Sequence, residues 1–202
     1  SYTVQKGYFS CNYMPQIYHS AAVFSGKTRV LLLNQRKDKA NNYERIQLLQ
    51  SAIQSCIENK SFAVAHLYND ERPMDIAIHD CYEIYYSISG GKQFLIDNRF
   101  YDIQPGDIFF INQYESHYLS QIDQAVHERI VLSIYPDFVK SISSQATDLN
   151  TCFHYRGSEV SHKLHLSEEE QNRFRYFIHS FTGFSGFGSD LEERAVFTEL
   201  MV

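Results

Sequence analysis

Short stretches rich in Val, Ile, Tyr and Phe follow one another from about residue 62 to residue 135. Turn signals separate several of them, among them Gly90-Gly91, Asp97-Asn98 and Pro105-Gly106-Asp107. Strands that recur every ~8 to 12 residues are typical of an antiparallel sandwich or barrel. The sequence therefore predicts a mainly β fold, with strands in FAVAHLY, MDIAIH, YEIYYSIS, KQFLID, RFYDI, DIFFIN, SHYLSQI and HERIVLSIY.

Helical patterns flank this block on both sides. Residues 42–58 carry apolar side chains at helical spacing and predict an amphipathic helix. Pro136 can open a short helix through residue 143. Ser167 and Ser189 each begin an S-x-x-E sequence, the capping-box pattern in which the Ser and Glu side chains bond each other's backbone N–H groups. Two C-terminal helices are therefore expected, and the second still continues at residue 202, which suggests that the natural protein is longer.

Composition excludes several classes of protein. With 44% hydrophobic and 21% charged residues, the 202-residue chain is typical of folded proteins. A net charge of −6 argues against nucleic-acid binding by this segment. None of the four cysteines forms a C-x-x-C pair, so neither a zinc ribbon nor a redox motif is indicated. Neither a signal peptide nor an apolar run of about 20 residues is present, so a cytoplasmic protein without a membrane segment is expected.

Two stretches carry the candidate chemistry: HDCYEIYYSISG at residues 79–90 and PGDIFFINQYESH at residues 105–117. His79, Glu83 and Tyr85 share parity, so along one strand they point to the same face. His117 can approach from a neighbouring strand. A carboxylate, imidazoles and a phenol around a small cavity suit a polyhydroxylated ligand, because each ligand hydroxyl both donates and accepts hydrogen bonds. These four residues are the predicted ligand-binding site.

Two alternatives for the same residues stay open. His79, Glu83 and His117 are three groups of the kind that hold a catalytic divalent metal ion with one position left open. A Glu–His pair can also be purely architectural, since a buried carboxylate is costly unless it is paired. We expect a structural role for the remaining histidines, which are His19, His66, His127, His154, His162, His165 and His179.

The two stretches resemble the two motifs of the cupin superfamily, which are small jelly-roll β-barrels. His79, Glu83 and Gly90 match the second His, the Glu and the Gly of the first motif. Ala77 stands where that motif has its first His. Pro105-Gly106-Asp107 matches the turn of the second motif, whose His arrives late, at His117. The resemblance implies a cupin-like antiparallel barrel, and the departure at Ala77 leads us to expect neither a metal nor another cofactor.

The late His117, together with YEIYYSISG, DIQPGDIFFIN and ESH, looks more specifically like the N-terminal sensor domain of the AraC family of bacterial transcription regulators. The resemblance covers about residues 62–200. It implies a barrel that binds an effector, often a sugar, followed by helices that form a homodimer. It further implies a DNA-binding domain with two helix-turn-helix units, which these 202 residues do not include.

The organisation implied by this resemblance has three parts. Residues 1–60 form an N-terminal extension, 61–140 the barrel, and 141–202 a helical dimerisation and linker region. The expected dimer contacts are apolar residues of the two C-terminal helices: Phe174, Phe177, Ile178, Leu191 and Ala195. On this reading the chain is not an enzyme but the sensing part of a regulator. The rival readings are a metal-dependent isomerase or dioxygenase using His79, Glu83 and His117, and a stand-alone sugar-binding module.

Overall fold

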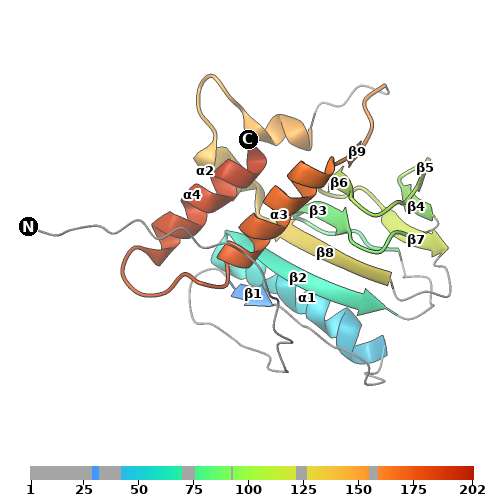
Figure 1. The fold of residues 1–202 in the computed structure, drawn as a ribbon, viewed down its shortest axis with the longest axis horizontal. Helices are drawn as coiled ribbons and strands as arrows, with labels where there is room; N and C mark the ends of the chain where they lie inside the picture. Colours follow the sequence, from blue (N-terminus) through green and yellow to red (C-terminus); the bar gives the residue numbers. More distant parts are fainter. Residues whose placement is uncertain (1–28, 32–41, 70–75, 92, 122–126, 155–158) are drawn as a thin grey trace, which may run out of the picture.

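The computed structural model describes residues 29–31, 42–69, 76–91, 93–121, 127–154 and 159–202. Two sheets and a set of flanking helices make up this part of the chain (Figure 1). The helices are α1 (Asn42–Asn59), α2 (Pro136–Ile142), the 3-10 helix η1 (Leu149–Cys152), α3 (Glu168–Ser180) and α4 (Ser189–Met201). The strands are β1 (Arg29–Leu31), β2 (Phe62–Asn69), β3 (Tyr82–Ser87), β4 (Gln93–Ile96), β5 (Arg99–Asp102), β6 (Asp107–Ile111), β7 (His117–Gln121), β8 (His127–Ile134) and β9 (Lys163–His165).

The larger sheet has the strand order β1-β2-β8-β3-β6-β9, and the smaller has the order β5-β4-β7. Every pairing is antiparallel except that of β1 with β2, which is parallel. The predicted fold class is confirmed: a cupin-like antiparallel barrel followed by two helices. The sequence analysis did not predict the short strand β9 or the parallel pairing of β1 with β2.

The central strands of the larger sheet are buried on both faces. Ala63, Tyr85 and Phe109 belong to an inner apolar cluster that includes residues of the smaller sheet and of α1. Ile84 and Leu132 belong to an outer cluster under the C-terminal helices. Because side chains alternate along a strand, β3 presents odd-numbered residues to the barrel interior and even-numbered residues to the helices. This arrangement explains why all six residues of β3 are buried.

The helix predictions are largely confirmed. α1 covers the predicted residues 42–58, and α2 begins at Pro136. Ser167 and Glu170 form the predicted capping box at the start of α3. The second capping box is wrong, because α4 has Gly188 as its N-cap, with φ 85 and no side-chain cap. A glycine reaches this left-handed conformation without strain, so the chain turns into α4 one residue before the expected Ser cap.

One strand prediction is also wrong where the structure describes it. Residues 76–79, the end of the MDIAIH stretch, form no strand, and a single bridge pairs Ala77 with His117. The beginning of that stretch and most of residues 1–41 lie outside the described residues. Within the described part, no helix is long and apolar enough to cross a membrane.

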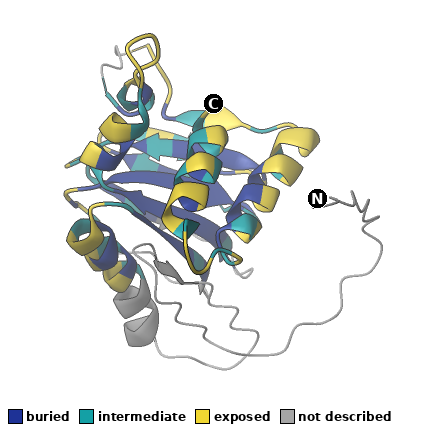
Figure 2. Ribbon diagram, turned by 90° about the vertical axis from the view of Figure 1, so that its left-hand side faces the viewer, coloured by how far each residue is buried: buried dark blue, intermediate teal, exposed yellow. Residues whose placement is uncertain are grey.

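The two C-terminal helices divide the predicted dimer contacts into two groups. Phe174, Phe177 and Ile178 of α3 are buried, and Phe174 and Ile178 pack in the outer cluster. Leu191 and Ala195 of α4 are exposed, Leu191 by 67%. Figure 2 shows exposed residues along the outer side of the helices that cover the large sheet. Only the α4 pair is open to a partner, because the α3 residues pack within the chain.

Candidate functional site

Glu83 lies inside the barrel between two histidines. It is 3% exposed, and its Oε2 atom lies 3.0 Å from Nε2 of His79 and 3.5 Å from Nε2 of His117. β3 carries Glu83, the segment before β3 carries His79, and β7 begins at His117. The bridge between Ala77 and His117 brings these segments together. The structure thus assembles three of the four predicted site residues.

The protonation of the two imidazoles follows from their other contacts. His79 Nδ1 lies 2.9 Å from the Cys81 carbonyl oxygen, and His117 Nδ1 lies 2.9 Å from the Glu115 carbonyl oxygen. A carbonyl oxygen only accepts, so each Nδ1 carries a hydrogen and donates it. Each Nε2 therefore meets Glu83 in one of two ways. It donates a second hydrogen as part of an imidazolium, or it offers a lone pair that requires a cation between the groups.

Charge pairing dominates this cluster. Burial favours the uncharged forms and so raises the pKa of Glu83, but His117 and His79 together hold it well below its usual range. Burial likewise lowers the pKa of His79, and bonds to Cys81 and Glu83 more than offset this and raise it to about 11. The pKa of His117 is also raised, because Glu83 outweighs the effect of burial. These directions describe the cluster without a bound cation: an ionised carboxylate between two protonated imidazoles.

The same three residues fit a divalent metal ion. One ligand atom from each of His79, Glu83 and His117 lies within 4.8 Å of the others. Two imidazoles and one carboxylate are a ligand set suited to iron and similar ions. Carbonyl groups that anchor both Nδ1 atoms leave Nε2 free to bind, as is usual around metal-binding histidines. The absence of a metal therefore stays a prediction, because the positions of these three side chains fit a bound ion as well as an empty site.

Ser133 adds a polar group that the sequence did not single out. Its β8 position pairs directly with Glu83 of β3, so both side chains point into the barrel. Ser133 is fully buried, and its hydroxyl has no hydrogen-bond partner among the described residues. Buried hydroxyl groups nearly always have a partner, so this one marks a place for a ligand or a water molecule. Ser133 shares parity with His127 and Val131 on one predicted strand, and this alternation was the sequence signal for its inward position.

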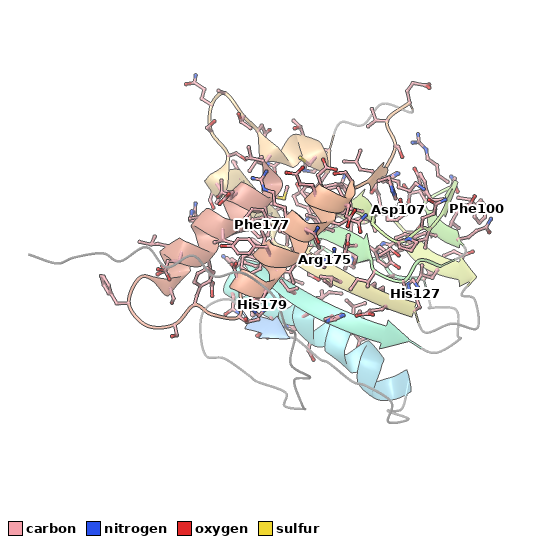
Figure 3. The ribbon with its side chains drawn as sticks, viewed as in Figure 1. Phe100, Asp107, His127, Arg175, Phe177 and His179 are labelled. Atoms are coloured by element: carbon pink, nitrogen blue, oxygen red, sulfur yellow. The ribbon has the colours of Figure 1, made fainter. Side chains whose placement is uncertain are left out.

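Tyr85 lies in the barrel but has a different partner. Its hydroxyl lies 2.5 Å from Nε2 of His127, and Nδ1 of His127 lies 2.6 Å from the Gly90 carbonyl oxygen. His127 begins β8 and is 1% exposed (Figure 3). Burial lowers its pKa to about 4, and the charge of Arg129 acts in the same direction. The sequence analysis expected a structural role for His127. Because His127, Arg129 and Val131 alternate along one strand, they share a face, and this alternation was the sequence signal that His127 points into the barrel.

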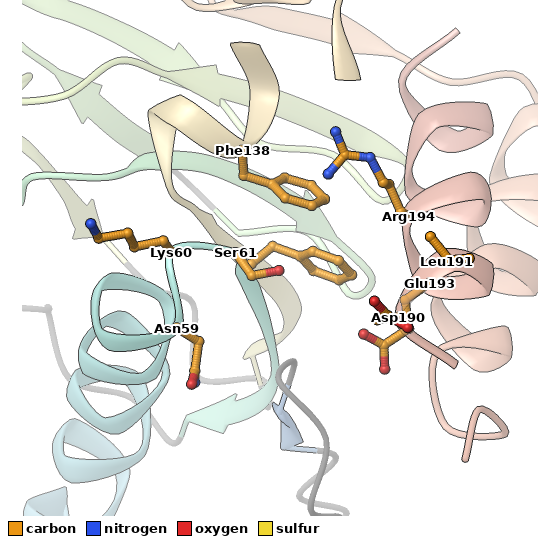
Figure 4. A pocket seen from close by; sticks show the side chains of 9 residues that line it. Asn59, Lys60, Ser61, Phe138, Asp190, Leu191, Glu193 and Arg194 are labelled. Atoms are coloured by element: carbon orange, nitrogen blue, oxygen red, sulfur yellow. The ribbon is translucent and has the colours of Figure 1, made fainter. Parts of the chain in front are cut away.

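Among the clefts on the described surface, two have a volume of about 290 Å³ each. One lies at the barrel rim and is lined by residues that include Arg99, Glu115 and His162. Glu115 also anchors His117 through its backbone, so this cleft borders the Glu83 cluster. The other lies between α4 and the start of β2, and its lining includes Phe62, Phe138 and Arg194. Figure 4 shows Phe138 and Arg194 at this cleft. Neither cleft is lined by His79, Glu83, Tyr85 or His117, so an internal ligand cavity remains a prediction.

Comparison with solved structures finds weak overall likeness. ToxT from Vibrio cholerae, bound to (E)-4-(8-methylnaphthalen-1-yl)but-3-enoic acid, is 13% identical with a TM-score of 0.48, and the match covers 69% of this chain and 54% of ToxT. This chain thus spans about half of ToxT. EutQ from Clostridium difficile is 18% identical with a TM-score of 0.33, over 41% of this chain and 63% of EutQ. The DMSP lyase DddQ from Ruegeria pomeroyi is 24% identical with a TM-score of 0.34, over 37% of this chain and 38% of DddQ.

No curated protein matches the chain at a significant level. A family model does match, that of the AraC-like ligand-binding domain, and it covers residues 60–201. The match begins just before β2 and ends with α4, so it includes both sheets except β1 and all the C-terminal helices. The chain therefore belongs to the family of AraC-like ligand-binding domains.

Proposed function

We propose that this chain is the effector-sensing and dimerisation portion of an AraC-like transcription regulator, and that its barrel binds a small polar molecule beside Glu83. The observation that carries the proposal has two parts. Glu83 and Ser133 are cross-strand neighbours inside the barrel, and the Ser133 hydroxyl has no hydrogen-bond partner among the described residues. An ionised carboxylate accepts hydrogen bonds, and the Ser133 hydroxyl both donates and accepts. A ligand hydroxyl group satisfies both, so a carbohydrate is the class that suits the site best.

The response to the effector is proposed to pass through the C-terminal helices. Leu191 and Ala195 are exposed on α4, so α4 is the helix that we propose for the homodimer contact. A DNA-binding domain after residue 202 is the proposed partner of the sensing portion. A ligand switches such a protein only when it binds one arrangement of the dimer more tightly than another.

The direct test is a titration of sugars against wild type and Glu83→Gln by calorimetry or thermal shift. Gln keeps the shape of Glu but replaces an acceptor-only carboxylate with an amide that also donates. Hydrogen bonds to a charged group are worth roughly 1.5 to 3 kcal/mol, so about a tenfold to hundredfold loss of affinity is expected. Glu192→Gln, on exposed α4, is the matched control and should bind like wild type. Unchanged affinity in Glu83→Gln would place the pocket elsewhere.

A metal-dependent enzyme is the second candidate, and the geometry of the two Nε2 atoms favours it. Both point at Glu83 while both Nδ1 atoms donate to carbonyl groups. His79, Glu83 and His117 would hold the ion, which would supply Lewis-acid or redox chemistry when bound. Elemental analysis of the purified protein separates the two candidates. Stoichiometric iron, manganese, nickel or zinc, lost in Glu83→Gln, would favour the enzyme, and sugar binding that persists in chelator would favour the sensor.

A further inference from the structure

A fully exposed phenylalanine lies beside the cleft between α4 and the start of β2. Phe187 belongs to the connector between α3 and α4, and its whole side chain is open to solvent. Gly186 and Gly188 flank it, each with φ 85, and a Cβ added at either glycine would meet no atom within 4 Å. This part of the connector therefore stands clear of the neighbouring structure and presents the Phe187 ring to solvent.

The connector holds this ring in place from both sides. Phe184, three residues earlier, packs against the outer cluster, and Phe197 of α4 is fully buried in the same cluster. Along the sequence, Phe187 precedes the exposed Leu191 by four residues, as Leu191 precedes the exposed Ala195. Three exposed apolar side chains at this spacing favour a contact surface over an isolated exposed ring.

The cleft has a lining that suits an aromatic ring (Figure 4). Its volume is about 290 Å³, and its apolar lining comes from Phe62 of β2, Phe138 of α2 and Leu191 of α4. The Phe62 and Phe138 rings lie 5.5 Å apart at an angle of 45°, and the Arg194 guanidinium lies 5.7 Å from the centre of the Phe138 ring. Aromatic edges and a guanidinium both attract a further aromatic ring.

The charges around the cleft favour a second copy of this chain as the partner. Lys60 and Arg194 line the cleft with positive charge. Asp190 and Glu193 line it with negative charge. Around a twofold axis a patch meets its own copy, so a patch with both signs can bring opposite charges together. The chain as a whole carries a net charge of −6, so two copies repel each other least where the local charges balance.

The position of the Phe187 ring also fits a twofold contact. Asp190, which lines the cleft, lies three residues after Phe187, so the ring and the cleft occupy the same end of α4. In a twofold contact, a ring that enters the partner's cleft implies that the partner's ring enters in return. Both insertions can then form around a single axis beside the N-terminal end of α4.

We propose that two copies of this chain associate by reciprocal insertion, in which Phe187 of each copy enters the cleft between α4 and β2 of the other. This inference rests on the proposed homodimer contact through α4 and specifies its geometry. The cleft is lined by α4 on one side and by β2 and α2 on the other, so the inserted ring contacts both. The arrangement of the dimer is thereby linked to the position of α4 against the barrel, which is the link that an effector has to use.

Sedimentation velocity over a series of concentrations tests the contribution of the ring in wild type, Phe187→Ala and Phe100→Ala. Each dimer of Phe187→Ala lacks two inserted rings, so its dissociation constant should rise by at least about tenfold. Phe100→Ala is the matched control and should associate like wild type. Phe100 is likewise exposed, but it lies on β5, at the opposite side of the molecule from α4 (Figure 3).

A cross-link between copies tests where the ring goes. Phe187→Cys and Asn59→Cys, prepared separately and then mixed, place one thiol on the connector of one copy and one thiol at the cleft of the other. Mild oxidation should join position 187 to position 59, as detected by peptide mapping under non-reducing conditions. If the mixture dimerises but links only position 187 to position 187, or forms no link to position 59, the proposal is wrong.

The outcomes separate this inference from the proposed function. Unchanged association of Phe187→Ala would overturn the insertion and leave the contact through Leu191 and Ala195 standing. A wild type that stays monomeric at high micromolar concentration would overturn both the insertion and the α4 contact. Neither result bears on sugar binding beside Glu83, which is measured on the same protein without reference to its association.

Discussion

The Glu83 carboxylate lies 3.0 Å from Nε2 of His79, which is four residues earlier in the chain and outside the strand. This contact makes Glu83 the centre of the charged cluster, since His117 approaches from the other side. Removal of one member of a buried charged set leaves the others unpaired, which costs about 3 to 5 kcal/mol. We therefore expect Glu83→Ala to lower the free energy of unfolding by that amount in urea denaturation at pH 6. Glu192→Ala should change it by less than about 0.5 kcal/mol. A loss below 1 kcal/mol for Glu83→Ala would mean that the cluster is not charged.

Ser133→Ala should separate binding from stability. The partnerless hydroxyl contributes nothing to the fold, and its removal abolishes the cost of burying it. We expect the variant to be as stable as wild type or more stable by up to about 1 kcal/mol, and to bind a sugar ligand more weakly. Thermal unfolding and calorimetry on the same samples measure both effects. A clear loss of stability would show that the hydroxyl has a structural partner.

Stability should fall in mild acid because of His127. Its pKa is about 4 in the fold, against an ordinary value of 6.5, so the unfolded chain takes up a proton first as pH falls. The stabilisation is complete above pH 6.5 and is lost as pH falls from 6.5 toward 4. Between pH 7 and pH 5 the loss amounts to about 2 kcal/mol.

Urea denaturation of wild type and His127→Gln at pH 7, 6 and 5 measures this effect. The variant should lose less stability over the interval, because it lacks the titrating group. His79 has a raised pKa, so its contribution to stability is complete below pH 6.5 and falls as pH rises from 6.5 toward 11. Within the tested interval it acts in the opposite direction to His127 and equally in both proteins, so the comparison between them isolates His127. Parallel pH dependence in the two proteins would show that His127 is not the source.

Gly106→Ala should destabilise the protein by about 1 to 3 kcal/mol. Gly106 has φ 87, and an added Cβ would stand 2.3 Å from Nε2 of Gln171 on α3. Gly183→Ala is the matched control, because Gly183 has no positive φ and its nearest atom is 3.7 Å away. Combining Gly106→Ala with Gln171→Ala should recover only the part of the loss that comes from the clash. Equal stability of the two glycine variants would contradict the argument from strain.

The double change Leu191→Glu and Ala195→Glu should shift the protein toward monomer in sedimentation velocity. Both residues are exposed on α4, so two carboxylates there oppose each other across a dimer interface without disturbing the core. Val160→Glu, an exposed change elsewhere, is the control and should leave association unchanged. If wild type is already a monomer at high micromolar concentration, α4 does not form the dimer contact.

Local patterns in the sequence were sufficient for most of the elements. Alternating apolar residues predicted the strands, helical periodicity predicted α1, and the Ser167 capping box predicted the start of α3. The failure at α4 is also local, because a glycine before the serine offers a turn that side-chain capping rules do not consider. These features depend on residues within about four positions of each other, so the sequence specifies them directly.

The site required contacts between distant residues. Parity placed Glu83 and Tyr85 on one face, and the resemblance to cupins joined them to His117. Yet which residues meet each other depends on strand order and register. Register sets Ser133 opposite Glu83, and packing brings His127 to Tyr85. A shift of one residue in register turns every side chain to the other face, so only the folded sheet decides which polar groups share the barrel interior.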